Sequence, residues 1–293
     1  GEFTLKMSTM SDLAAFHVTE GKLEEAEALY IETLESVRHV LGETDPRTLI
    51  SMKDLAGLYE TMGVYGRAEP LYEKSLQGQR VVLGPQDTNT LTTMNCLARL
   101  YESQGKYAKA AGLYTESLEN HRSVYGQNHA QTLTTMNNLA LVYSNLGKYS
   151  LAEPLYLQCL QAKRQVFGAN HREALTTMSN LAGLYFDQNK TTQAEEMYVE
   201  CLHTMEEVLG RGDPRTLATL HNLAAMYYGC GKFGEAMTHF QDSHIRLSMV
   251  LGEEHEDTKA AHCWLEKARQ ELFRINQFMD VGSEGSFAGS FQE

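Results

Sequence analysis

The sequence lacks the features that mark a membrane protein or a nucleic-acid-binding protein. No apolar run in its 293 residues approaches the roughly 20 residues of a membrane span. Proline and tryptophan are also scarce, with 5 and 1 residues. Positive charge is also scarce, since 25 Lys and Arg against 38 Asp and Glu give a formal net charge of -13. Such a charge repels phosphate backbones. We therefore expect neither membrane insertion nor nucleic-acid binding.

Signals for disulfide pairing and secretion are missing as well. The five cysteines are odd in number, form no Cys-x-x-Cys pair and lie in apolar helical patterns. No start of the secretory type is present, so reduced thiols and a cytoplasmic location are expected. Residues 1–4 begin with Gly-Glu-Phe, which is typical of a cloning remnant, and we expect this segment to be such a remnant or disordered.

The dominant feature that is present is a repeat of 42 residues. One unit reads Leu139-Ala140-x-x-Tyr143, followed by Ala152 and Tyr156. The period alone also fits HEAT and armadillo arrays, but these internal intervals match the tetratricopeptide pattern. The sequence therefore predicts an all-α fold, a right-handed superhelical α-solenoid of helix-turn-helix repeats. The Leu-Ala pairs begin at Leu13, Leu55, Leu97, Leu139, Leu181 and Leu223.

Helix ends can be predicted from the residues between the repeated pairs. Glycine recurs where each first helix should stop, as at Gly147, and Asn189 replaces it once. An Asp or His column, including Asp45 before Pro46, predicts N-caps of the first helices. In the second unit this gives helices over roughly 46–62 and 65–82. Pro70 is expected in the first turn of the second helix.

The repeat also predicts the division of the chain. A further helix over 258–279 keeps Leu265 in register but has Glu266 in place of the small Ala, which is typical of a capping helix with one solvated face. Residues 280–293 are rich in Gly and Ser and are expected to form a flexible tail. The six repeats are expected at about 5–47, 48–89, 90–131, 132–173, 174–215 and 216–257.

The stretch from Thr132 to Tyr156, together with the Leu-Gly at the close of most units, resembles the kinesin light chain and nephrocystin-3-like tetratricopeptide repeats. The resemblance covers about residues 5–278. It implies that first helices line a concave groove that binds an extended peptide, often through asparagines that grip the peptide backbone. The matching positions precede each Leu-Ala pair and include Asn138, Asn180 and Asn222.

Neighbouring first-helix positions complete the predicted peptide-binding groove. A side-chain amide can both donate and accept, so it can satisfy a peptide unit of any sequence. The alternative interpretation is that these amides bond within the scaffold and tie one unit to the next. The predicted groove residues are Lys53, Asn95, Arg99, Asn137, Asn138, Leu141, Asn145, Asn180, Phe186, His221, Asn222 and Tyr228. Their mixed chemistry reproduces only part of the basic groove of kinesin light chains that bind tryptophan-acidic peptides.

No pattern indicates catalysis, a metal site or a cofactor. The sequence has no His-Glu-x-x-His, P-loop or Gly-x-Ser-x-Gly motif, and His129, His171 and His255 fall in the N-cap column. We therefore expect a non-enzymatic scaffold or adaptor whose partner is a protein or peptide. The alternative is a structural or regulatory array that acts through self-association, by its end helices or its C-terminal tail, or through control of a further signalling domain.

Overall fold

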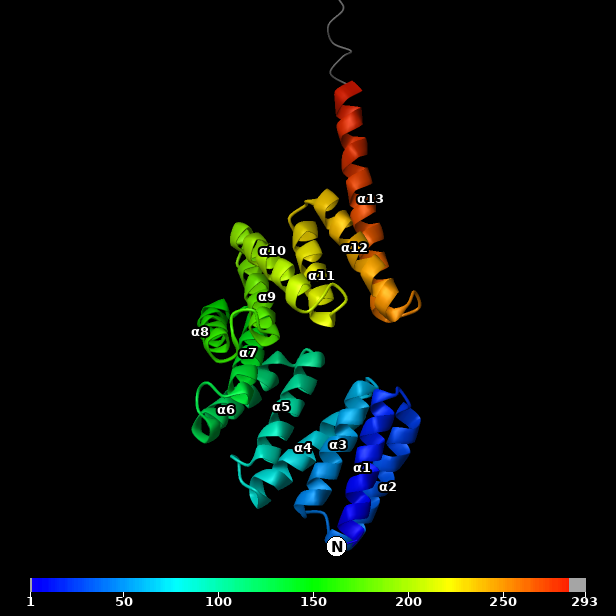
Figure 1. The fold of residues 1–293 in the computed structure, drawn as a ribbon, viewed down its shortest axis with the longest axis vertical. Coiled ribbons are helices and arrows are strands. Elements are labelled where there is room, and N and C mark those ends of the chain that lie inside the picture. Colours follow the sequence, from blue (N-terminus) through cyan, green and yellow to red (C-terminus); the bar gives the residue numbers. More distant parts are fainter. Residues whose placement is uncertain (1, 285–293) are drawn as a thin grey trace, which may run out of the picture. The chain divides into compact units, whose positions relative to one another are not determined.

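The computed structural model describes residues 2–284, which form thirteen helices and no strand in that range (Figure 1). No helix among these residues is long and apolar enough to cross a membrane. The bounds are α1 (Glu2–Thr19), α2 (Leu23–Leu41), α3 (Pro46–Thr61), α4 (Tyr65–Val82), α5 (Thr88–Ser103), α6 (Tyr107–Tyr125), α7 (Ala130–Asn145), α8 (Tyr149–Phe167), α9 (Arg172–Asp187), α10 (Thr191–Val208), α11 (Pro214–Gly229), α12 (Phe233–Leu251) and α13 (Glu256–Glu284).

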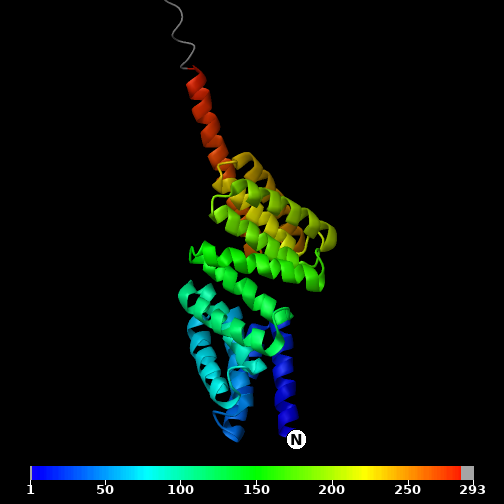
Figure 2. The same cartoon turned by 90° about the vertical axis from the view of Figure 1, so that its left-hand side faces the viewer.

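The helices belong to two compact units, residues 1–155 and 156–293, which divide within α8. Unit 1 holds α1 to α7, and unit 2 holds α9 to α13. Within each unit the helices alternate between a first helix, which carries the Leu-Ala pair in all but α13, and a second helix that runs back along it (Figure 2). The expectation of an all-α fold of paired helices is confirmed.

Each first helix from α3 onward begins where an Asp or His side chain caps it. Asp45 Oδ1 accepts a hydrogen bond of 2.9 Å from the Arg47 amide, and Asp213 Oδ1 accepts one of 2.8 Å from the Arg215 amide. The histidines act in the same way, since His129 Nδ1 accepts a 3.3 Å bond from the Gln131 amide. These caps start α3 at Pro46, as predicted for that helix, and place the starts of the first helices from α3 onward two residues before the predicted repeat boundaries.

Glycines in the left-handed region stop the first helices as predicted. Gly147 has φ +69°, and Asn189, which replaces glycine once, has φ +61°. The seventh first helix, α13, has Phe273 at this position and continues through Glu284. Residues 280–284 are therefore helical rather than part of a tail, and the capping helix spans 256–284. The expected tail over 285–293 lies outside the described residues.

Two further expectations are corrected by the helix bounds. The segment 2–4 is not disordered, because α1 already begins at Glu2, while Gly1 lies outside the described residues. Pro70 lies inside α4, which begins five residues earlier at Tyr65, so it is not in the first turn. A proline at such a position removes one amide-to-carbonyl bond of the helix. Pro154 lies in the same way inside α8.

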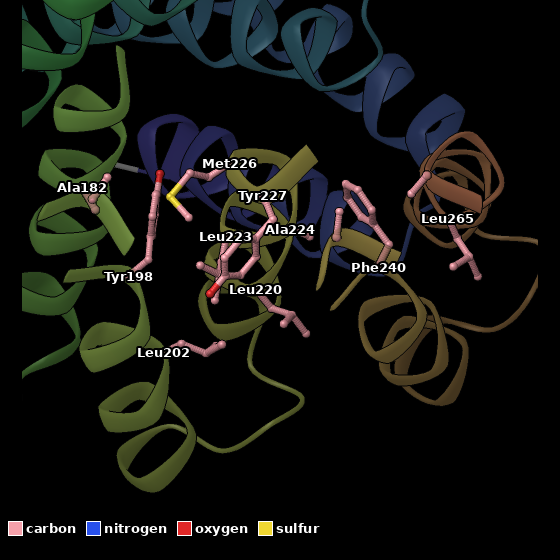
Figure 3. Packing of buried hydrophobic residues seen from close by; sticks show 13 residues of the cluster. Ala182, Tyr198, Leu202, Leu220, Leu223, Ala224, Met226, Tyr227, Phe240 and Leu265 are labelled. Atoms are coloured by element: carbon pink, nitrogen blue, oxygen red, sulfur yellow. The ribbon is translucent and has the colours of Figure 1, made fainter. Parts of the chain in front are cut away.

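Small and large residues alternate in the core. Ala182, Ala224 and Ala236 are fully buried and allow close approach of the helices, while Phe240 and Leu223 fill the space between them (Figure 3). In α1 the leucine at the corresponding repeat position is exposed to solvent. Leu13 is 45% exposed, whereas its counterpart Leu223 is 1% exposed.

Candidate functional site

The first helices of unit 1 form a pocket between α5 and α7, with α6 as its floor. The cavity measures about 230 Å³ and contains three of the predicted groove residues, Asn95, Arg99 and Asn138. We call it the α5–α7 pocket. The remaining lining residues are Thr92, Cys96, Tyr114, His121, Gln131 and Thr134.

Asn95 is fixed by the scaffold. Its Nδ2 donates a hydrogen bond of 3.1 Å to Thr135 Oγ1 on α7, and its Oδ1 accepts one of 2.7 Å from Ser117 Oγ on α6. Asn137, at the same repeat position on α7, is buried at 7% exposure. The bonds of Asn95 therefore fit the alternative interpretation that the sequence left open, in which asparagines hold the repeats together.

Arg99 is also engaged within the protein. Its Nε and Nη2 donate to the Glu60 carboxylate at 2.9 and 3.2 Å, and Tyr72 Oη donates to the same carboxylate at 2.9 Å. The bidentate pair raises the pKa of Arg99, so its positive charge is permanent. A ligand carboxylate would have to compete with Glu60 for this guanidinium.

Burial favours the neutral form of two titratable groups in this pocket, His121 on α6 and Cys96 on α5. Burial lowers the pKa of His121, whose Nδ1 lies 2.8 Å from the Ser117 carbonyl oxygen and donates to it. Burial likewise raises the pKa of the Cys96 thiol. A thiol in this state is a poor nucleophile. The pocket is therefore suited to hydrogen bonding rather than to covalent chemistry.

The first helices of unit 2 form a second pocket between α11 and α13, with α12 as its floor. This cavity measures about 340 Å³ and contains the predicted residues His221 and Asn222. We call it the α11–α13 pocket. The remaining lining residues are Gly212, Pro214, Leu217, Ala218, Ser243, Leu247, Val250, Leu251, Asp257, Ala260 and Trp264.

Aromatic rings form one wall of the α11–α13 pocket. The Trp264 ring stacks on Phe240, with centroids 5.9 Å apart at 16°, and meets Tyr228 edge-on at 5.6 Å. His221 lies 5.3 Å from Phe240, and burial lowers its pKa, which favours the neutral imidazole. Lys267 Nζ lies 4.3 Å from the Trp264 ring centroid. The tryptophan is thus held firmly in place.

The other predicted groove residues are distributed along the first helices. Phe186 packs across α9 and α11 so closely that a Cβ on Gly229 would lie 2.8 Å from its Cζ, which makes it a scaffold residue. Lys53 Nζ pairs with Asp54 at 2.9 Å. Leu141 is half-buried and Asn145 is exposed on α7, and Asn180 is half-buried on α9.

Sequence reasoning missed Trp264 and the second-helix residues at the pocket floors. Trp264 lies one 42-residue step after Asn222, so the asparagine column ends in the only tryptophan of the chain. Ser117 and Ser243 also occupy a single column of small polar residues on the second helices, and both are fully buried. Extending the columns into the capping helix and the second helices would have found them.

The family is shown by comparison with known proteins. The Tetratricopeptide repeat model matches residues 5–80, 55–123, 89–165, 131–207 and 173–244. The chain belongs to the tetratricopeptide repeat family. The predicted fold class, an all-α α-solenoid of tetratricopeptide helix pairs, is thereby confirmed. No curated protein sequence matches the chain.

Solved structures agree with this tetratricopeptide assignment. The kinesin light chain-type repeats of Podosopora anserina are 21% identical, with a TM-score of 0.64 over 70% of this chain and 96% of that chain. BtubC (BKLC) from P. vanneervenii is 26% identical, with a TM-score of 0.62 over 80% of this chain and 94% of that chain. NprR, solved in complex with its cognate peptide NprX, is 17% identical, with a TM-score of 0.60 over 98% and 84%. The expected resemblance to kinesin light chain-like repeats is confirmed in fold.

Proposed function

We propose that this tetratricopeptide protein is an interaction scaffold that binds an extended peptide segment of a partner protein along its first helices. The observation that carries the proposal is the position of the asparagine column. Asn138 lines the α5–α7 pocket and Asn222 lines the α11–α13 pocket, whereas the Leu-Ala pairs next to them are buried. In each unit an amide thus stands beside a cavity that a partner side chain can enter.

The chemistry of the amide suits this role. Asn222 is exposed, and its side chain can donate to a peptide carbonyl and accept from a peptide amide at the same time. Such paired bonds recognise backbone rather than sequence, so the pockets beside the amides would provide selectivity. The NprR structure holds a peptide, which supports the general use of this fold for peptides.

A displayed random-peptide library, selected against the whole chain, tests the proposal. Selected peptides should bind the chain more weakly when Asn138→Ala or Asn222→Ala is introduced. Losing one hydrogen bond corresponds to roughly a five-fold loss of affinity per amide. Gln241→Ala, an exposed change on the second helix α12, is the matched control and should leave affinity unchanged.

Two results would count against the proposal. One is a selection that yields no binder with saturable affinity. The other is a set of binders that are weakened by Gln241→Ala but not by either asparagine change, because their site would then lie on the second helices. Circular dichroism of each variant should match the parent chain and exclude unfolding.

The open face of α1 favours self-association as a second candidate function. Leu13 is 45% exposed and Phe16 is 56% exposed, whereas their counterparts Leu55 and Leu58 on α3 are 4% and 2% exposed. A second copy of the chain could cover this face, α1 against α1. Sedimentation velocity should then show a concentration-dependent dimer that is lost in Leu13→Ser with Phe16→Ser. A monomer at all concentrations would contradict it.

A further inference from the structure

The α11–α13 pocket combines a buried hydroxyl that has no partner with an aromatic wall. The pocket between α1 and α3 also has a buried hydroxyl without a partner, Thr33 Oγ1, but no tryptophan lines it. Ser243 on α12 is fully buried, and its Oγ has no hydrogen-bond partner among the described residues. Beside it, Leu217, Leu247 and Val250 supply an aliphatic lining. A buried hydroxyl that lacks a partner costs free energy, and a ligand that supplied one would recover it.

The same column shows how this position is satisfied in two other repeats, whereas Thr33 on α2 lacks a partner as Ser243 does. Ser75 Oγ donates 2.6 Å to the Leu49 carbonyl, and Cys201 Sγ donates 3.3 Å to the Leu175 carbonyl. The residue that corresponds to these acceptors for Ser243 is Leu217, and no such bond is formed there. The Ser243 hydroxyl is therefore available to a group that enters the pocket from the first-helix side.

The shape and lining of the pocket indicate the kind of group. A cavity of about 340 Å³ has room for one large side chain, and the Trp264 ring provides an aromatic wall that is already held by Phe240 and Tyr228. Aromatic rings pack favourably against such a wall. A ring with a polar tip would pack its body on Trp264 and Leu247 and present the tip to Ser243. Among protein side chains, tyrosine matches this description best.

We propose that the α11–α13 pocket is an anchor subsite for a tyrosine side chain of the bound partner, with its phenolic hydroxyl paired to Ser243. This inference rests on the proposed peptide-binding function and specifies one of its contacts. Among the described lining residues Asp257 alone carries a full charge, and it is exposed. A basic residue next to the tyrosine would suit this carboxylate, and an acidic one would be disfavoured.

Trp264 is the only tryptophan of the chain and lies in the pocket wall, so its fluorescence reports occupancy directly. We would titrate the whole chain with p-cresol, which is the tyrosine side chain as a free molecule, and with toluene, which lacks the hydroxyl. The expected result is a saturable change in Trp264 emission, with p-cresol about five-fold tighter than toluene because of one added hydrogen bond.

Two variants make the test specific to this site. Ser243→Ala should remove the preference for p-cresol while leaving toluene binding unchanged, and it should fold, because it deletes a buried group that has no partner. Ala218→Trp, at an exposed lining position, should fill the cavity and abolish both titrations; this second tryptophan is read out by calorimetry rather than by emission. Calorimetry of the parent chain is the matched reference.

Three outcomes would overturn the inference: no saturable response, equal affinity for p-cresol and toluene, or a preference that persists in Ser243→Ala. These failures are distinguishable from failure of the proposed function. Library peptides that depend on Asn138 and Asn222 without any p-cresol response would refute the anchor alone. A p-cresol site that Ser243 controls, in a chain that selects no peptides, would support the pocket and refute the peptide-binding function.

Discussion

The first helices of the two units are held together by partly different chemistry. In unit 1 the ties are polar: Arg99 on α5 pairs with Glu60 on α3, and Asn95 on α5 bonds to Thr135 on α7. Unit 2 keeps one polar tie, the 3.1 Å bond from Thr219 on α11 to Ser179 on α9, but aromatic contacts replace the ion pair, since Phe186 packs on Gly229 and Tyr228 packs on Trp264. Glu60, Phe186 and Tyr228 occupy the same repeat position. One scaffold position can therefore hold neighbouring repeats by charge or by packing.

This difference also changes what each pocket can bind. The polar ties of unit 1 occupy the groups that line the α5–α7 pocket, so a ligand there would have to exchange hydrogen bonds. The aromatic ties of unit 2 leave a cavity that combines an unsatisfied hydroxyl with the ring of Trp264. Unit 2 is thus the better place for an anchoring side chain, and unit 1 for contacts with the peptide backbone.

The largest effect is expected from Phe240→Ala in unit 2. Phe240 is fully buried and stacks on Trp264, so truncation should lower the free energy of unfolding by about 3–5 kcal/mol. Urea unfolding followed by Trp264 emission measures unit 2, and far-ultraviolet circular dichroism measures the whole chain. Gln241→Ala is the exposed control. A shift of less than about 1 kcal/mol would mean that the aromatic wall does not hold unit 2 together.

A smaller and salt-dependent effect is expected from Arg99→Met in unit 1. The change leaves the Glu60 carboxylate with Tyr72 as its remaining partner, and since the Arg99 side chain is 58% exposed, a cost of about 1 kcal/mol is expected. The cost should shrink at high NaCl because salt screens an exposed ion pair. The cost of Phe240→Ala should not change with salt. Equal salt dependence of the two variants would contradict the contrast between the units.

Acidification should weaken unit 2 through its partly buried histidines, His221 and His239. Burial lowers the pKa of His221 and His239, so the unfolded chain binds protons more readily than the folded one. Their contribution is complete above the unfolded pKa of about 6.5, and it is lost as the pH falls below that value. His221→Gln should therefore reduce the loss of stability on going from about pH 7.5 to about pH 5.5. His203→Gln, at an exposed position, is the control. If His221→Gln and His203→Gln lose the same amount of stability over this pH range, His221 is not a source of the acid sensitivity.

The smallest effect is expected from Leu13→Ala on α1. Its side chain is 45% exposed, so the change should cost about 0.5 kcal/mol, whereas Leu223→Ala at the same repeat position should cost about 2–5 kcal/mol. Urea unfolding at low protein concentration measures both. A large cost for Leu13→Ala that grows with protein concentration would instead indicate that a second copy covers α1.

Much of the fold could be predicted from the sequence because its signals are local. Each of these signals acts within a few residues. Asp45 caps the start of a helix, and Gly147 and Asn189 end helices, all as expected. Prediction failed where a local signal was read too broadly. Pro70 lies inside α4 instead of in its first turn, and Phe273 carries α13 past the point where glycine stops the other first helices.

The functional residues were harder to predict because a repeat column does not reveal partners. In the sequence, Asn95 and Asn138 are both asparagines at predicted groove positions. In the structure, Asn95 is bonded to Thr135 and Ser117 and is therefore part of the scaffold. Arg99 is a groove cation by position, but Glu60 already pairs with it. These bonds join residues on different helices, so no spacing along one helix could have shown them.

The sequence by itself determined the 42-residue period, the helix pairs and their ends, because backbone caps, glycine turns and the helical spacing of Leu, Ala and Tyr are short-range properties. Only the tertiary structure decided which polar side chains are consumed by neighbouring repeats and which face a cavity. That outcome depends on the packing of three helices around each pocket. Trp264, Ser243 and Asn222 become one candidate site only when α11, α12 and α13 come together.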